Sequence, residues 1–134
     1  MGEKEEFLKE LKERIRKSDE LYLVAKKLFK DGYLEDAASR AYYSLFHLLT
    51  AYLILEGGTT KTHKGLLNRI GLKIKEGKMS KKIGRVLRTL FQYRETADYG
   101  IFTFFTEDEI SVMLKELDEI RAEIKEVNLN IENL

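Results

Sequence analysis

Two histidines are the side chains best suited to proton transfer near neutral pH in this chain of 134 residues, which contains no cysteine. His47 and His63 are sixteen residues apart, and neither belongs to an HExxH pair or another zinc-binding spacing. The lack of cysteine excludes a thiolate nucleophile, a disulfide framework and cysteine-bound metals. Neither a Gly-rich phosphate loop nor a G-x-S-x-G nucleophile motif occurs. We therefore predict no metal site and no cofactor.

A line of polar residues crosses an otherwise apolar segment. Asp36, Arg40, Tyr43, His47 and Thr50 recur at steps of four, three, four and three, which places them on one face of a helix. Polar side chains on such a helix need partners or solvent. The line is either part of a binding surface or simply the exposed side of the helix.

A second polar pair stands near the end of a later predicted helix. Arg94 and Asp98 are four residues apart and can form an ion pair, flanked by Tyr93 and Tyr99. The base precedes the acid, which is the less favourable order for the helix dipole, so helix stability alone does not explain the pair. It either lines a ligand cleft or is a local ion pair packed against aromatic rings.

Charge is distributed very unevenly, although the net charge is only +1. Residues 60–94 carry 11 bases and 1 acid, whereas residues 95–134 carry 3 bases and 11 acids. Either two helices of opposite sign lie side by side, or a basic surface meets an anion such as nucleic acid. The predicted electrostatic stripe for nucleic acid consists of Lys78, Lys81, Lys82, Arg85 and Arg88, with further bases upstream at Lys61, Lys64 and Arg69.

The elements that must position these side chains are helices. Apolar residues recur at three- and four-residue steps over residues 3–30, 34–56, 62–75, 78–99 and from Thr106 onward, and proline is absent. Thr106 and Glu109 form a predicted capping box. The segment 34–56 has two apolar stripes and should be the central helix. We predict one all-α domain over residues 1–134, an antiparallel up-and-down bundle of four to five helices.

Two features favour a homodimer. The predicted loop 100–105 contains four large apolar residues, which either fold back on the core or are covered by a second subunit. The last helix carries an apolar seam from Ile110 to Ile131, longer than one small bundle needs. The most apolar stretch, residues 45–55, is too short and too polar to span a bilayer, so we expect a cytoplasmic protein without membrane contact.

Three segments in order carry a family resemblance. The second predicted helix reads AASRAYYSLFHLLTAYLILEG and is followed by KTHKGLL and then by YRETADYG. At this spacing the chain resembles the HEPN family. It looks most like the stand-alone subfamily with an A-x-R-A-Y-Y-x-x-F helix, a T-H pair opening the third helix and an R-x-x-A-D-Y segment closing the fourth. The resemblance covers roughly residues 20–125.

This resemblance implies a helical bundle that commonly forms homodimers and is often encoded beside a minimal nucleotidyltransferase, as in toxin–antitoxin pairs. Active members are metal-independent ribonucleases whose motif has an Arg, a polar residue and, four to six positions after the Arg, a His, with two copies meeting across the dimer. Arg94 matches that Arg and Glu95 the polar residue. Asp98, Tyr99 or Gly100 stands where the His would be.

Three functions therefore remain open. The first is a non-catalytic, homodimeric HEPN binding module for RNA or a nucleotide, or one that docks on a minimal nucleotidyltransferase. The second is a ribonuclease in which His63 or His47 comes close to Arg94 and replaces the missing base. The third is a purely structural helical partner. The first reading assigns the ligand cleft to Arg40, Tyr43, His47, His63, Arg94, Asp98 and Tyr99.

Overall fold

The computed structural model describes residues 2–58, 60–100 and 104–130. These residues form five α-helices and a short terminal π-helix, with no strand among them. The all-α prediction is therefore confirmed. The helices are α1 (Gly2–Lys30), α2 (Leu34–Leu55), α3 (His63–Lys75), α4 (Lys81–Tyr99), α5 (Glu107–Glu123) and η1 (Ile124–Asn128).

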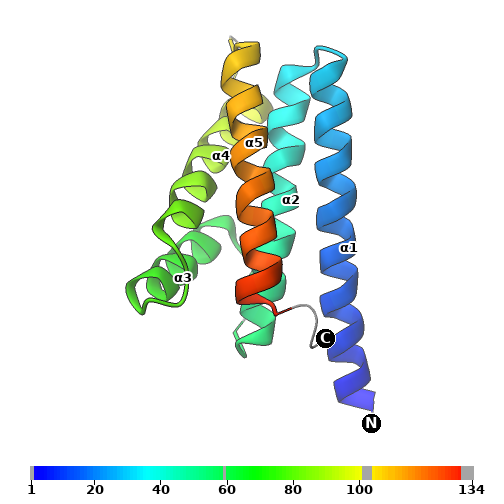
Figure 1. Cartoon of the computed structure of the whole chain (residues 1–134), viewed down its shortest axis with the longest axis vertical. Coiled ribbons are helices and arrows are strands. Elements are labelled where there is room, and N and C mark those ends of the chain that lie inside the picture. The colour runs from blue at the N-terminus through cyan, green and yellow to red at the C-terminus, as the bar shows by residue number, and fades with distance from the viewer. Residues whose placement is uncertain (1, 59, 101–103, 131–134) are drawn as a thin grey trace.

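Four of the helices run up and down as an antiparallel bundle, as the sequence predicts. In Figure 1, α1, α2 and α5 stand side by side, and α4 lies beside and behind α5. The short α3 lies at one end of the bundle, between the end of α2 and the start of α4, and packs against both.

The central position of α2 follows from its two apolar stripes. Leu45, Leu48, Leu49 and Leu53 are fully buried, and α2 packs against α1, α3, α4 and α5. A helix that is apolar on most sides can bury its apolar surface only if other helices surround it. The polar side chains in the middle of α2 are therefore covered by neighbouring helices, whereas Asp36 and Arg40 near its start are exposed.

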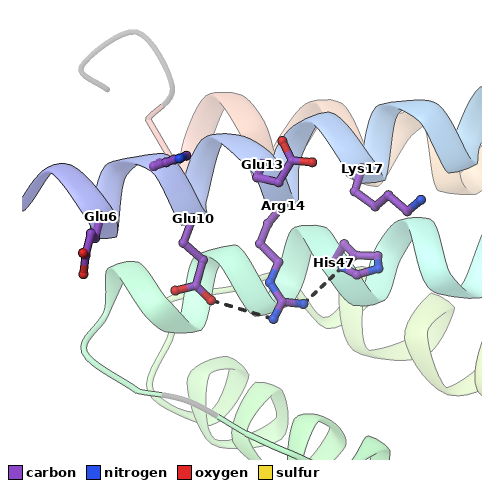
Figure 2. A pocket seen from close by; sticks show the side chains of 7 residues that line it. Glu6, Glu10, Glu13, Arg14, Lys17 and His47 are labelled. Carbon is purple, nitrogen blue, oxygen red and sulfur yellow. Dashed lines mark hydrogen bonds and ion pairs between the residues drawn. The ribbon is translucent and has the colours of Figure 1, made fainter.

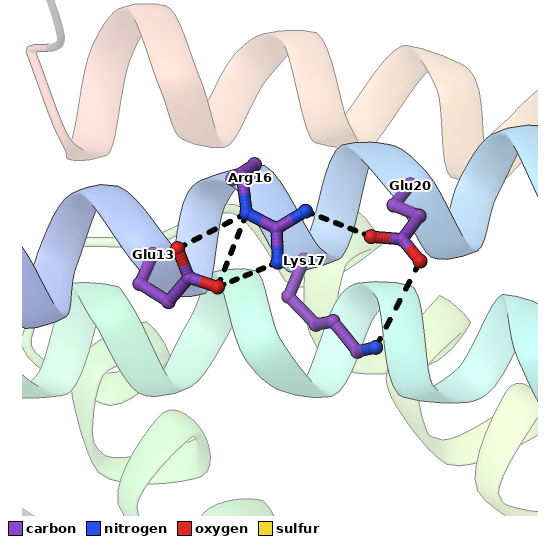
Figure 3. Close-up of polar contacts among 4 residues, drawn as sticks. All are labelled: Glu13, Arg16, Lys17 and Glu20. Atoms are coloured by element: carbon purple, nitrogen blue, oxygen red, sulfur yellow. Dashed lines mark hydrogen bonds and ion pairs between the residues drawn. The ribbon is translucent and has the colours of Figure 1, made fainter.

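A dense set of charges covers the solvent face of α1 (Figure 3). The Arg16 guanidinium lies 2.5 Å from a Glu13 carboxylate oxygen and 2.8 Å from one of Glu20, and the Lys17 ammonium lies 3.9 Å from Glu20. Residues three and four apart on a helix are neighbours, so these pairs stabilise α1 locally. This face needs no partner helix.

The fourth helix begins at Lys81, three residues later than predicted. Gly77 has a φ of +78°, a left-handed conformation that ends α3, and Ser80 is the N-cap of α4. Lys78 therefore lies in the turn and not on the helix, which corrects its place in the predicted stripe. The Lys78 carbonyl accepts a hydrogen bond of 2.8 Å from the Asn128 side-chain amide.

Most of the apolar seam of the last helix is buried within the chain. Its members Ile110, Met113, Leu117, Ile120 and Ile124 are all buried, and the capping box of Thr106 and Glu109 is present. The seam faces α1, α2 and α4 of the same bundle. Val127, the next member of the seam, is 70% exposed, and Ile131 lies outside the described residues. The buried part of the seam is covered by helices of the same chain, and the homodimer remains a prediction.

The predicted apolar loop 100–105 divides between two environments. The Phe105 ring packs against Tyr93, with ring centroids 5.0 Å apart, and so folds back on the core. Phe104 is 87% exposed. Residues 101–103 lie outside the described ranges.

A buried polar network that the sequence analysis did not anticipate joins α5 to α1. The guanidinium of Arg121 pairs with Asp19, lies 4.7 Å from the centre of the Tyr22 ring, and donates a long 3.4 Å hydrogen bond to the Ser18 hydroxyl. Ser18 and Ser44 donate to each other's carbonyls at 2.7 and 2.8 Å, which ties α1 to α2. Small side chains thus allow the two helices to approach closely.

Candidate functional site

Three helices bring Arg94 and His63 onto the same pair of tyrosine rings. His63, the first residue of α3, lies with its Nδ1 2.6 Å from the Tyr42 hydroxyl and its ring centroid 6.0 Å from that of Tyr43. The Cζ of Arg94, on α4, is 5.4 Å from the centre of the Tyr43 ring and 6.0 Å from that of Tyr42. We call Tyr42, Tyr43, His63, Arg94 and Tyr99 the Arg94 cluster.

Arg94 is only 8% exposed although its guanidinium stays charged. Its Nε lies 3.0 Å from an Asp98 carboxylate oxygen, as the spacing of the two residues predicts, and its Nη1 donates to Glu95 at 2.8 Å. Its Cζ lies 5.6 Å from the centre of the Tyr99 ring, and Tyr99 is 69% exposed. A guanidinium has five N–H donors, so these carboxylates fix its orientation without using its full capacity.

The environment of His63 favours the neutral imidazole. Burial lowers the pKa of His63, the positive charge of Arg94 lowers it further, and Glu95 offsets part of this effect. The position of His63 in the first turn of α3 also disfavours a cation, because the helix N-terminus carries partial positive charge. The ring further packs against Phe46 and Phe91. A neutral ring held at Nδ1 by Tyr42 can donate or accept at its other nitrogen.

The turn before α3 holds His63 in place. Thr62 is the N-cap, and its hydroxyl accepts a 2.9 Å hydrogen bond from the backbone N–H of Gly65. A Cβ at Gly65 would stand 2.3 Å from the Thr60 hydroxyl oxygen and 2.9 Å from that of Thr62. The position therefore requires glycine for reasons of space.

Replacing Gly65 by alanine is expected to displace the cap and, with it, His63. We expect the free energy of unfolding to fall by about 1 kcal/mol, the usual cost of losing a cap, and the NMR resonances of the His63 ring to shift. Gly71→Ala is the matched control, because a Cβ there meets nothing within 4 Å. Equal effects of the two substitutions on stability would contradict this account of the turn.

His47 lies in a different place, in a groove between α1 and α2 (Figure 2). The Arg14 Nη1 lies 3.2 Å from the His47 Nδ1, and Arg14 also lies 3.8 Å from Glu10. Because a guanidinium only donates, Nδ1 must accept and the imidazole is neutral. The cavity here measures about 490 Å³ and is lined by Glu6, Lys9, Glu10, Glu13, Arg14, Lys17 and His47. The two histidines thus serve separate sites, and only His63 shares the Arg94 cluster.

His47 should make stability depend on pH. Burial, Arg14 and Lys17 lower the pKa of His47 from 6.5 to about 4. A lowered pKa means that the unfolded chain binds the proton more tightly, so the stability held above pH 6.5 is lost as the pH falls towards 4. Between pH 7 and 5, urea unfolding should show a steeper loss for the wild type than for His47→Gln. Parallel curves would contradict the assignment.

The rest of the predicted polar line of α2 does not act as one surface. Arg40 and Asp36 are exposed, and within the described ranges no hydrogen bond or ion pair joins Arg40 to the Arg94 cluster. Thr50 is buried, and its hydroxyl donates to the Phe46 carbonyl of its own helix at 2.7 Å. Of the line, only Tyr43 lies in the cluster.

The predicted basic stripe on α4 is partly neutralised by α5. Lys82 forms an ion pair with Glu119, and Arg85 lies 2.6 Å from Glu116. Lys78, in the turn, lies 3.7 Å from Glu56. For these bases the pairing of opposite helices accounts for the charge asymmetry, whereas Lys81 and Arg88 are exposed.

Three features in or next to the Arg94 cluster could not be read from the sequence. Tyr42 follows the apolar spacing of α2 with Phe46 and Leu49, yet its hydroxyl contacts His63. Phe91 and the Thr60–Gly65 contact were also not recognised. The Tyr-Tyr pair in the central helix was an available signal, since a buried tyrosine hydroxyl usually needs a partner.

In the part of the chain that the structure describes, no group of three or more His, Asp or Glu residues could hold a metal ion. No described helix is long and apolar enough to cross a membrane.

Comparison with known proteins places the chain in a family. The model of the HEPN domain matches residues 11–127. A UPF0332 protein of Thermotoga maritima is 31% identical over 119 residues, covering 88% of each chain. A UPF0332 protein of Archaeoglobus fulgidus is 37% identical over 109 residues, 81% of this chain and 87% of that protein. "Putative toxin MJ0605" of Methanocaldococcus jannaschii is 30% identical over 122 residues, 88% of this chain and 91% of that protein.

The family match, the similar relatives and the five-helix bundle agree with the resemblance carried by the three sequence motifs. The chain belongs to the HEPN domain family.

Proposed function

We propose that this protein is a HEPN-type binding module whose Arg94 cluster binds single-stranded RNA or a nucleotide. The observation that carries the proposal is the convergence of α2, α3 and α4 on one guanidinium, packed among three tyrosines and next to a neutral histidine. Stacking on aromatic rings and on guanidinium planes is how proteins commonly hold unpaired bases.

The charge balance of the cluster favours contact with a base over contact with a phosphate alone. The carboxylates of Glu95 and Asp98 form ion pairs with the Arg94 guanidinium and offset its charge. These carboxylates can accept hydrogen bonds from the amino groups of bases. The exposed Tyr99 ring offers a stacking surface at the mouth of the cluster. A nucleobase, which has a flat face and N–H donors, matches this combination.

The names of two relatives support a biological setting for the proposal. Two archaeal relatives carry the word toxin in their names. HEPN domains resembling this one are often encoded beside a minimal nucleotidyltransferase, so we propose that the protein acts in a toxin–antitoxin-like pair and docks on such a partner. Co-purification from the native source, with mass spectrometry of bound polypeptides and nucleotides, tests this part; a clean protein without either would contradict it.

A homodimer is part of the same proposal. Phe104 and Tyr33 are exposed at one end of the bundle, beside a cavity of about 330 Å³, and large exposed aromatics often mark an interface. We expect a second copy to cover them. Sedimentation equilibrium should give twice the mass of one chain, and Phe104→Ser should return the mass of a monomer. A wild-type monomer at every concentration would contradict the dimer.

The direct test of RNA binding is fluorescence anisotropy with a short labelled single-stranded RNA. Saturable binding that weakens steeply with added salt is expected, because phosphate contacts release counterions. Absence of saturable binding at low salt to both this RNA and a mononucleotide would overturn the proposed function.

A ribonuclease is the second candidate, and the contact between Tyr42 and His63 favours it. If the Nδ1 proton of His63 is donated to the Tyr42 oxygen, Nε2 is free to take the proton of a ribose 2′-hydroxyl. The 2′-oxygen would then attack the adjacent phosphorus, the bond to the 5′-oxygen would break, and that oxygen would take up a proton from water, while Nε2 of His63 would return its proton to the solvent. The products would be a 2′,3′-cyclic phosphate and a 5′-hydroxyl end.

Gel analysis of RNA incubated with the protein separates the two candidates. Cyclic-phosphate products that disappear in His63→Gln and decrease in Tyr42→Phe would establish the enzyme. Intact RNA, bound but not cleaved, would leave the binding module. Cleavage unchanged in His63→Gln would exclude His63 as the base.

A further inference from the structure

We infer that the exposed face of α3, and not the basic stripe of α4, carries the phosphate backbone of single-stranded RNA bound at the Arg94 cluster. We call this surface the α3 track; it consists of Lys61, Lys64, Asn68, Gly71 and Lys75. The inference rests on the proposed function and adds the path that the strand follows.

The need for a separate source of positive charge comes from the cluster itself. Arg94 contacts two carboxylates, those of Glu95 and Asp98, and burial together with the charge of Arg94 lowers the pKa of His63 and so disfavours its cationic form. The cluster alone therefore does not attract a polyanion. Nucleic-acid affinity comes largely from lysines and arginines that neutralise phosphates, so such residues must lie next to the cluster.

The α3 track begins where the cluster ends. His63 is the first residue of α3, Lys64 follows it directly, and Lys61 lies just before the helix. Lys64, Asn68, Gly71 and Lys75 are spaced by four, three and four residues, so they share one face of the helix. All four residues are exposed.

The opposite face of α3 packs into the bundle through Leu66 and Ile70. At a rise of 1.5 Å per residue, the face from Lys64 to Lys75 is roughly 16 Å long, enough for a few successive phosphates.

The lysines of the track are not neutralised by the chain. Within the described ranges, no ion pair joins Lys61, Lys64 or Lys75 to a carboxylate. Lys73, which lies off this face, is held by Glu56 at 3.6 Å and Glu76 at 3.8 Å. On α4, Lys82 and Arg85 are paired with glutamates of α5. Lys81 and Arg88 of α4 also form no ion pair among the described residues. Lys61 and Lys64, however, lie within two residues of His63 in the chain, which makes the α3 track the unpaired charge that adjoins the cluster.

Gly71 gives an independent indication of a ligand on this face. It lies in the interior of α3, where glycine weakens a helix relative to alanine. A Cβ at Gly71 would meet nothing within 4 Å, so no packing within the described chain accounts for the missing side chain. The gap lies between Lys64 and Lys75 and leaves room for a strand to approach the helix backbone.

Two triple variants of equal charge test the inference. Lys61→Gln/Lys64→Gln/Lys75→Gln removes three charges from the α3 track, and Lys81→Gln/Arg85→Gln/Arg88→Gln removes three from α4. Anisotropy with short single-stranded RNA should show a loss of roughly tenfold or more for the α3 variant at low salt, and a salt slope shallower by about 0.7 per lost contact. The α4 variant should remain close to wild type. Circular dichroism confirms that each variant is folded.

Gly71→Ala supplies a second readout, in which stability and binding move in opposite directions. We expect its Tm to rise, because alanine favours the helix, and its RNA affinity to fall, because the methyl group fills the approach to the backbone. Wild-type affinity in both Gly71→Ala and the α3 variant, or a loss in the α4 variant as large as in the α3 variant, would overturn the α3 track.

Different results would contradict the proposed function and the proposed path of the RNA strand. If the wild type binds no RNA, the proposed function is wrong. If RNA binding depends on Arg94 but not on the α3 lysines, only the path of the strand is wrong.

Discussion

Replacing Arg94 by alanine is expected to weaken binding of single-stranded RNA by roughly 10- to 100-fold and to leave the bundle folded. Each hydrogen bond from a charged group contributes about 1.5–3 kcal/mol, and tenfold in affinity corresponds to about 1.4 kcal/mol. Arg94 also packs on Tyr42, Tyr43 and Tyr99, so the substitution removes the plane on which a base would stack. Fluorescence anisotropy at fixed salt measures the loss.

Two controls separate binding from stability. Arg94→Lys keeps the charge but loses the planar fork, so it should restore little of the affinity. Arg85→Ala removes a guanidinium that pairs with Glu116 on the exposed side of α4, and it should bind nearly as well as wild type. If Arg94→Ala mainly lowers the Tm and leaves RNA binding unchanged, the ion pair with Asp98 is structural and the third reading of the sequence, a helical interaction protein, is favoured.

Replacing Leu45 by alanine should produce the largest loss of stability among these variants. Leu45 is 0% exposed at the centre of α2, and removing a fully buried leucine side chain costs about 2–5 kcal/mol through lost transfer energy and the cavity that remains. Leu72→Ala makes the same chemical change on α3, where the side chain is 60% exposed, and should cost less than about 0.5 kcal/mol. Urea unfolding measures both; similar costs would contradict the central position of α2.

Much of the fold could be predicted from local patterns. The apolar steps of the five helices and the two stripes of α2 repeat every three or four residues, and each pattern is complete within one helix. The boundary error at α4 has a local cause, because the sequence after Gly77 continues an apolar spacing through Met79 while the left-handed glycine and the Ser80 cap start the helix later. Met79 lies in the turn before α4, and its side chain is nevertheless buried.

The site was harder to predict, because its contacts join residues that are far apart in the chain. The pair of Arg94 and Asp98 is local and could be predicted. Which histidine approaches Arg94 depends on how α3 packs on α2: His63 reaches the tyrosine pair, whereas His47 points into the groove with Arg14. The sequence left both open because the spacing of the residues does not show how α3 packs on α2.

The pairing of the basic stripe on α4 also depends on contacts between residues that are far apart in the chain. Sequence periodicity placed the bases on one side of α4, but the carboxylates of Glu116 and Glu119 that neutralise Arg85 and Lys82 come from α5. A charge run becomes a ligand surface only where the fold brings no opposite charge against it. On α3, Lys64 and Lys75 form no ion pair among the described residues, whereas Lys73 is paired with Glu56 and Glu76.

An NMR titration of the isotope-labelled protein with short single-stranded RNA, following every backbone amide, tests directly whether the Arg94 cluster is the binding site. The largest shifts are expected in the Arg94 cluster, at residues 42–43 and 94–99, and should extend through residues 61–65. Shifts confined to the α1–α2 groove around His47, or no shifts at saturating RNA, would contradict the assignment of the Arg94 cluster as the binding site.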